Sequence, residues 1–113
     1  MNLPTPSERR ELARQARDAF PPMGVYAVRD RVTGAVRVAS SRNVHSAINR
    51  ALFELRQGVH RDAAMQAAWR RDGAQRLVFE VLELVKERSE AGFDYAAELK
   101  ELEALHRALL ELQ

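Results

Sequence analysis

The chain has 113 residues, of which 46% are hydrophobic, and its formal net charge is +2. That length predicts about one globular domain with a buried core. The absence of cysteine excludes disulfide bonds and thiolate zinc sites. The sequence has no apolar run near the length of about 18 residues that a transmembrane helix needs. We also expect no signal peptide, and hence a cytoplasmic protein that does not bind membranes.

Basic residues are concentrated in the first two thirds of the chain. Residues 1–76 hold fourteen arginines and seven acidic residues, a net charge of +7, whereas residues 77–113 hold four basic and nine acidic residues, a net charge of −5. Arginine binds phosphate groups through two parallel hydrogen bonds, so this division favours a nucleic-acid partner for the basic part. The alternative interpretation is that these charges are simply solvated.

The N-terminal segment carries a helix start signal. Residues 5–8 form a capping box with proline at the first helical position. They predict a helix from Pro6 to about Ala19, which a pair of prolines then ends. Its apolar stripe is narrow and it is rich in arginine, so it either packs on the domain through its alanines or follows phosphates as a basic arm. We assign residues 1–22 to a helical extension and residues 23–113 to the domain.

Residues 24–44 have the pattern of a strand, a turn, a second strand and a helix start. β-forming residues alternate partly on both sides of Thr33-Gly34, which predicts a hairpin. Asn43 is the expected N-cap of a helix from about Val44 to Gln57. The polar run between the second strand and this helix is Ser40, Ser41, Arg42 and Asn43. Hydroxyl and backbone N–H groups at such a junction can bind an anion, although an ordinary helix cap explains the same residues.

A further helix and strand are predicted after Gly58, which should end the first domain helix. The helix runs from about Asp62 to Asp72 and turns Trp69 inward as a core residue. Near its end lie three arginines that would extend any basic face: Arg70, Arg71 and Arg76. A strand from Arg76 to Val85 follows. It is apolar on both faces, so we expect it at the centre of the sheet.

The last helix begins near Asp94 and has leucines at spacings of three and four, at positions 99, 102, 105, 109 and 112. Such an amphipathic stripe packs on a sheet, or it pairs two copies of the chain as a homodimer. Together the elements predict an α+β fold with an extra N-terminal helix. Its small three-stranded sheet, made of the β-hairpin and a later central strand, is flanked by helices.

Several residues occur in an order that is found in a known family. Gly24-Val25-Tyr26 and Arg37-Val38-Ala39 lie on the two hairpin strands, and the matches that follow are Gly58, His60, Gln66, Trp69 and Gly73. The segment resembles the GIY-YIG endonucleases, in which a GIY and a YIG tripeptide lie on adjacent strands before a helix. The resemblance implies that fold and a nucleic-acid partner, with DNA preferred and RNA as the alternative. The residues expected to contact nucleic acid are Ser40, Ser41, Arg42, Asn43, His60, Arg70 and Arg71.

Catalysis in that family uses two motif tyrosines, an arginine on the following helix and a glutamate that holds a divalent metal. Tyr26 matches the first tyrosine, whereas Arg37 replaces the second and Ala47 stands at the position of the arginine. Arg50 lies one helical turn beyond Ala47 on the same face. Through the resemblance, the candidate catalytic residues are therefore Tyr26, Arg37 and Arg50.

The metal-binding glutamate of that family should lie on the last helix. Glu103 fits best by its spacing from the helix end, and the alternatives on the same helix are Glu98 and Glu101. One carboxylate can hold Mg²⁺ together with substrate phosphate, so Mg²⁺ is the cofactor that an active enzyme would need.

Three hypotheses about function follow. The first is a nucleic-acid-binding protein of the GIY-YIG type with weak or lost endonuclease activity, because the departures from the motif remove groups that stabilise charge on the phosphate. The second is an active, divergent, metal-dependent endonuclease in which Arg37 or Arg50 replaces the missing arginine. The third is a protein–protein interaction module that uses the leucine-rich last helix.

Overall fold

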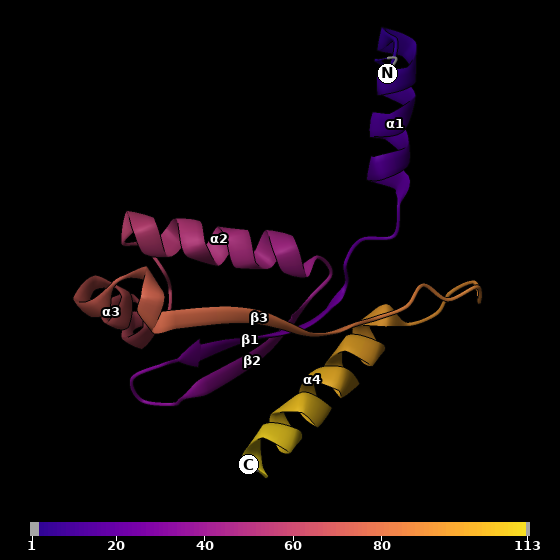
Figure 1. Cartoon of the computed structure of the whole chain (residues 1–113). Helices are drawn as coiled ribbons and strands as arrows, with labels where there is room; N and C mark the ends of the chain where they lie inside the picture. Colours follow the sequence, from indigo (N-terminus) through magenta and orange to yellow (C-terminus); the bar gives the residue numbers. More distant parts are fainter. Residues whose placement is uncertain (1–2, 113) are drawn as a thin grey trace.

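The structure is a computed structural model that describes residues 3–112, apart from the side chains of residues 15–18. Its elements are α1 (Pro6–Asp18), β1 (Gly24–Asp30), β2 (Val36–Ser41), α2 (Val44–Gln57), α3 (Ala63–Asp72), the 3₁₀ turn η1 (Ala74–Arg76), β3 (Leu77–Leu84) and α4 (Tyr95–Glu111). Helices α2 and α3 lie on one face of a three-stranded sheet and α4 lies on the other (Figure 1). The predicted α+β architecture is confirmed.

The order of the strands corrects one prediction. All pairings are antiparallel and the order is β2-β1-β3, so β1 is the central strand and β3 is an edge. The expectation that β3 is central was wrong. Its apolar side chains are only partly covered, because Val78, Val81 and Leu84 each keep more than a third of their surface exposed. A strand that is apolar on both faces can therefore lie at the edge of the sheet with much of its apolar surface exposed.

A bulge lies where β1 meets β3. Val25 pairs with Glu83 and Tyr26 pairs with Val81, so Leu82 has no partner on β1. The extra residue moves Glu83 to the face opposite the one that simple alternation predicts, and there it contacts His106 of α4. Gly24 begins β1 at this point, and a Cβ atom on Gly24 would overlap the backbone carbonyl of Glu83. Only glycine allows the two strands to approach this closely.

The main core lies between the sheet and the helix pair α2 and α3. Its buried residues are Val28, Leu55, Met65, Ala68 and Leu77, with Tyr26, Trp69 and Phe79 packed against them. The predicted inward position of Trp69 is confirmed, although its side chain is only partly buried. On the opposite face of the sheet, Leu99 of α4 is buried. These two layers fix the position of Tyr26 relative to α2.

Helix α1 extends away from the domain (Figure 1). The capping box is confirmed, because Thr5 and Glu8 exchange hydrogen bonds between side chain and backbone N–H in both directions, each of 3.2 Å. The described side chains of α1 are exposed, Leu12 and Ala13 included, so the packing that its alanines suggested is not seen at the positions described. Ala16, which belongs to the same stripe, lies outside the described side chains.

None of the described helices is long and apolar enough to cross a membrane.

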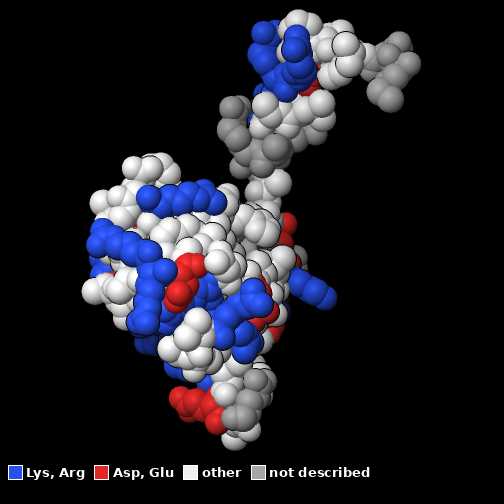
Figure 2. Space-filling view, turned by 60° about the vertical axis from the view of Figure 1, so that its left-hand side comes forward, with Lys and Arg blue, Asp and Glu red and all other residues white. Residues whose placement is uncertain are grey.

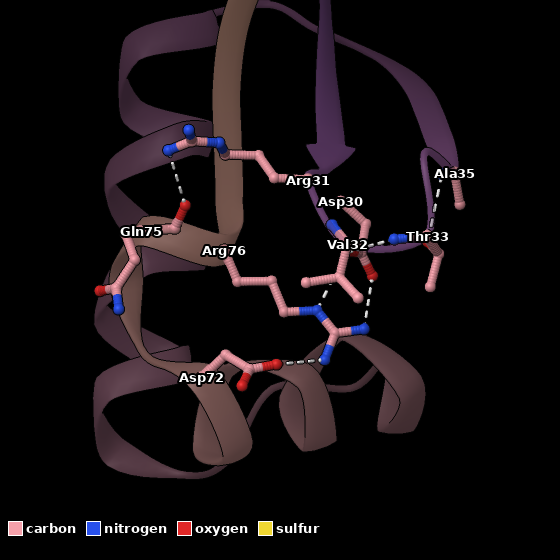
Figure 3. A network of polar contacts seen from close by, with 8 residues as sticks. All are labelled: Asp30, Arg31, Val32, Thr33, Ala35, Asp72, Gln75 and Arg76. Atoms are coloured by element: carbon pink, nitrogen blue, oxygen red, sulfur yellow. Dashed lines mark hydrogen bonds and ion pairs between the residues drawn. The ribbon is translucent and has the colours of Figure 1, made fainter.

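An ion-pair network joins the hairpin to α3, and we call Asp30, Asp72 and Arg76 the hairpin clamp (Figure 3). Two nitrogens of Arg76 donate to the two carboxylate oxygens of Asp30, each at 2.9 Å, and the third donates to Asp72 at 2.7 Å. The Arg76 side chain is only 11% exposed. These hydrogen bonds hold the pKa of the Asp30 carboxyl well below its usual range. Arg76 was expected in the strand and on a basic face, but it lies in η1 and is fully engaged within the fold.

Candidate nucleic-acid interface

An open pocket lies where β2 passes into α2. Four segments supply its wall: Tyr26 of β1, the junction residues 41–43, one face of α2, and the loop between α2 and α3. Its lining residues are Tyr26, Ser41, Arg42, Asn43, Ser46, Ala47, Arg50, Ala51, Glu54, His60 and Arg61. We call this the junction pocket. It brings together six of the residues that the sequence marked as candidates, which are Tyr26, Ser41, Arg42, Asn43, Arg50 and His60.

The junction residues cap the helix. Asn43 Oδ1 accepts a hydrogen bond of 3.0 Å from the N–H of Ser46, which confirms the predicted N-cap. Ser41 Oγ accepts from the N–H of Asn43 and donates to its carbonyl, both at 3.0 Å. Ser40 does not line the pocket, because it pairs with Val25 and alternation places its side chain on the opposite face of the sheet from Ser41. The polar run is therefore first a helix cap, and Arg42 is its exposed member.

The charge of the junction pocket is positive. It is lined by three arginines, Arg42, Arg50 and Arg61, against a single acidic residue, Glu54. Arg50 approaches Glu54 at 3.7 Å, but its side chain is 81% exposed, and such surface ion pairs contribute about 0–1 kcal/mol. Within residues 3–112, Arg42 and Arg61 form no ion pair. Seen from the side on which α3 lies, basic side chains outnumber acidic ones on the surface (Figure 2).

Tyr26 is half-buried in the pocket wall. Burial raises the pKa of its hydroxyl, and the negative charge of Glu103 raises it further. The phenol is therefore uncharged at neutral pH and can hold a water molecule or a phosphate oxygen by hydrogen bonding.

Glu103, the predicted metal ligand, does not line the junction pocket. It lies on α4 and forms an ion pair of 3.5 Å with Arg107, whose guanidinium donates to the Val38 carbonyl at the free edge of β2. Its charge nevertheless acts on Tyr26. No group of three or more His, Asp or Glu residues that could hold a metal ion occurs in the described part of the chain. A single carboxylate fits Mg²⁺ only where water and phosphate complete the coordination.

Arg37 is held away from the pocket. By register it shares a sheet face with Tyr26, since Val28 pairs with Arg37 and Tyr26 pairs with Ala39. Its guanidinium forms an ion pair with Asp62, the N-cap of α3, and it is not among the residues that line the junction pocket. Of the two arginines predicted to replace the missing catalytic one, only Arg50 faces the pocket.

The loop between α2 and α3 carries His60 into the pocket wall. His60 Nδ1 accepts a hydrogen bond of 3.0 Å from the N–H of Asp62, so the neutral ring carries its proton on Nε2. The other two arginines predicted to contact nucleic acid lie on the last turn of α3, outside the pocket. Arg70 donates to the Gly58 carbonyl at 3.1 Å, and Arg71 is exposed.

Three pocket features escaped the sequence-based prediction. Arg61 adds a charge beside His60, Glu54 offsets part of the charge of Arg50, and Ser46 completes the first turn of α2. For Ser46 and Glu54 the available signal was the helical spacing of residues 46, 47, 50, 51 and 54, because positions three and four apart share one helix face. Arg61 lies in the loop after α2, where this spacing gives no signal.

Comparison with solved structures identifies the fold of this chain. No protein-family model matches the chain, and no curated protein matches it in sequence. Among solved structures, the catalytic domain of the homing endonuclease I-TevI matches with a TM-score of 0.50 and 23% identity, covering 71% of this chain and 87% of that one. A glutamate-to-alanine mutant of the same intron endonuclease domain matches with a TM-score of 0.50 and 21% identity, covering 71% and 82%. The chain thus has a GIY-YIG-like fold.

Proposed function

We propose that this protein binds nucleic acid at the junction pocket, with DNA as the preferred ligand, and that its endonuclease activity is weak or lost. The observation that supports this most is the composition of the pocket wall. Three arginines face one glutamate around Tyr26 in a domain with the nuclease-like fold. Surface arginines with weak or no ion pairs can bind the phosphates of nucleic acid. This binding releases the counterions of the phosphates and gives an affinity that does not depend on base sequence.

The chemistry of the pocket supports weak or absent hydrolysis. Cleaving a phosphodiester requires a positioned water, a cation near the phosphate and help for the leaving oxygen. Tyr26 can orient a water molecule, but Ala47 stands where the resemblance requires arginine, and Arg37 is paired with Asp62. Where Mg²⁺ binds, Glu103 would hold it, and the ion would supply positive charge to the phosphate. Loss of one preorganised donor typically costs about a hundredfold or more in rate.

The first experiment is binding of a fluorescently labelled DNA duplex as a function of salt, with Mg²⁺ present and the DNA inspected afterwards for cuts. We expect affinity to fall steeply with salt, with a log–log slope of about −0.9 for each phosphate contacted, and the DNA to stay intact. A labelled single-stranded RNA of the same length tests the alternative ligand. No binding to either at low salt would refute the proposal.

The position of Arg50 favours one alternative function, that of an active, divergent endonuclease. It is the arginine that lies on the face of Ala47 and reaches the pocket, and its weak ion pair leaves it free to move toward a phosphate. If Mg²⁺-dependent cuts appear, Arg50→Ala should abolish them without unfolding the protein. Arg37→Ala, which changes an arginine outside the pocket, is the matched variant and should leave most of the cleavage.

The exposed leucines of α4 favour a second candidate function, association with a protein partner or a second copy. Leu105, Leu109 and Leu112 remain exposed while Leu99 of the same helix is buried. We propose a homodimer through this stripe as the simplest form. Light scattering should then show a dimer that Leu109→Glu converts to a monomer. A monomeric wild-type protein at high concentration would refute this form of association.

A further inference from the structure

One polar side chain in the core is used to hold a loop. Gln66 of α3 is only 6% exposed. Its amide nitrogen donates to the Leu55 carbonyl at 3.0 Å, and its amide oxygen accepts from the backbone N–H of His60 at 2.9 Å. One side chain therefore connects the end of α2 to the loop that follows it. Burying an amide is costly unless its hydrogen bonds are satisfied, and here both ends are used.

A second side chain of α3 supports the same loop. Arg70 donates to the Gly58 carbonyl at 3.1 Å. Gly58 has φ 77°, the left-handed conformation that ends α2, and a Cβ atom there would lie 2.9 Å from Arg70 Nη2. The loop over residues 58–62 is thus held at Gly58 by Arg70 and at His60 by Gln66. Both side-chain contacts come from α3, so this helix helps to fix the position of the loop.

The imidazole of His60 is oriented within this loop. The N–H of Asp62 donates to Nδ1 at 3.0 Å, which leaves the proton of the neutral ring on Nε2. Asp62 is also the N-cap of α3, accepting from the N–H of Met65 at 3.0 Å. Because His60 lines the junction pocket, its remaining nitrogen is a hydrogen-bond donor at a positively charged surface.

We infer that Gln66 is a positioning residue: by fixing the loop over residues 58–62, it holds His60 so that Nε2–H donates to a phosphate oxygen of nucleic acid in the junction pocket. This inference rests on the proposed function, which supplies the phosphate. The burial of Gln66 alone would indicate only a contribution to stability. The N–H of Asp62 selects the tautomer of the His60 ring, and Gln66 acts on that selection by holding the loop in which the two groups meet.

The first test needs no nucleic acid. NMR of the His60 ring nitrogens in the wild-type protein should show a single tautomer with the proton on Nε2. Gln66→Met keeps the length and apolar volume of the side chain but removes both hydrogen bonds, and we expect it to give a mixture of tautomers in a protein that is still folded. Gln57→Met, at an exposed position near the end of α2, is the matched control and should keep the single tautomer. A proton on Nδ1 in the wild type, or an unchanged tautomer in Gln66→Met, would overturn the inference.

The second test measures binding of the labelled DNA duplex at low salt. His60→Asn places an amide near the position of Nδ1 and removes the donor at Nε2, so we expect affinity to fall about tenfold, as for loss of a hydrogen bond to a charged group. His60→Gln carries an amide N–H near the position of Nε2, and it should bind within about threefold of the wild type. Equal losses in His60→Asn and His60→Gln would show that the donor does not matter and would overturn the inference.

A double variant that combines Gln66→Met with His60→Asn tests whether Gln66 acts on binding through His60. If Gln66 acts through His60, Gln66→Met weakens binding on its own but adds little further loss when His60→Asn is already present. Fully additive losses would overturn the positioning role. Failure of the wild-type protein to bind the duplex would refute the proposed function and the phosphate contact together, and the NMR result would then decide the positioning of the ring by itself.

Discussion

The arginine of the hairpin clamp and the arginines of the junction pocket lie toward opposite ends of the same sheet face and differ in how they are paired. In the hairpin clamp, Arg76 is 11% exposed and bound to two carboxylates at 2.7–2.9 Å. In the junction pocket, Arg50 is 81% exposed, and its one acidic neighbour lies at 3.7 Å. The residue type is the same, but the first arginine is part of the architecture and the second is available to a ligand.

The number and distance of acidic neighbours cause this difference. Asp30 and Asp72 surround one arginine, whereas Glu54 faces three. A count of charges along the sequence cannot separate the two cases, because it gives Arg76 and Arg50 equal weight. The basic excess of the first 76 residues is therefore available to a partner only where no acidic side chain meets it.

The largest effect is expected from breaking the clamp. Arg76→Met would leave two partly buried carboxylates without their cation, so the midpoint of thermal unfolding should fall further than in any other variant proposed. Arg56→Met, an exposed position on α2, is the control and should change the midpoint little. DNA affinity, corrected for the folded fraction, should stay unchanged in both. A stable Arg76→Met protein would show that the clamp contributes little to the fold.

Removing the pocket arginines should weaken DNA binding and leave thermal stability unchanged, the reverse of the effect expected for Arg76→Met. We expect Arg50→Ala and Arg61→Ala each to weaken duplex binding on the order of tenfold at low salt, and to make the salt slope shallower by about 0.9 for each phosphate that is no longer neutralised. Thermal unfolding should be unaffected, because both side chains are exposed. Arg31→Ala, an exposed arginine at the hairpin, is the matched control. Equal losses at Arg31 and Arg50 would mean that binding follows overall charge and not the pocket.

Acid should weaken the clamp before it affects the pocket arginines. The pKa of Asp30 is lowered in the folded protein, so its contribution to stability is complete above the unfolded value of about 3.9 and is lost as pH falls below it. Urea unfolding between pH 7 and pH 2 should show this loss in the wild type and a flatter profile in Asp30→Asn. Parallel profiles for the two proteins would exclude Asp30 as the source.

The smallest effect on binding is expected at Tyr26. Tyr26→Phe removes one uncharged hydroxyl, so duplex affinity should change by less than about threefold. Any residual Mg²⁺-dependent cleavage should disappear, since the hydroxyl is the group placed to orient water. A gel assay at high enzyme concentration measures both. Residual cleavage that survives in Tyr26→Phe would point to a contaminating nuclease or to a different catalytic water site.

Local signals in the sequence predicted the local structure well. Asn43 and Gly58 mark the two ends of α2, and the capping box starts α1 as expected. Each of these depends on residues within four positions of one another, and a single chain displays such signals fully. The hairpin and the general architecture followed from the same kind of pattern.

Features that depend on distant partners were not predictable in this way. Arg76 meets Asp30 across 46 residues, and Arg37 meets Asp62 through the packing of α3 against the hairpin. The edge position of β3 depends on which strand pairs with β1, which an apolar pattern does not specify. The charge of Glu103 raises the pKa of Tyr26, and no pattern in the sequence predicted this interaction between residues 77 positions apart.

Gly24 has a consequence for how such chains are classified. Its lack of a side chain is required by the carbonyl of Glu83 on the neighbouring strand, so selection for a stable sheet would preserve it even after every catalytic group had changed. A signature built on this glycine detects architecture and carries no information about chemistry.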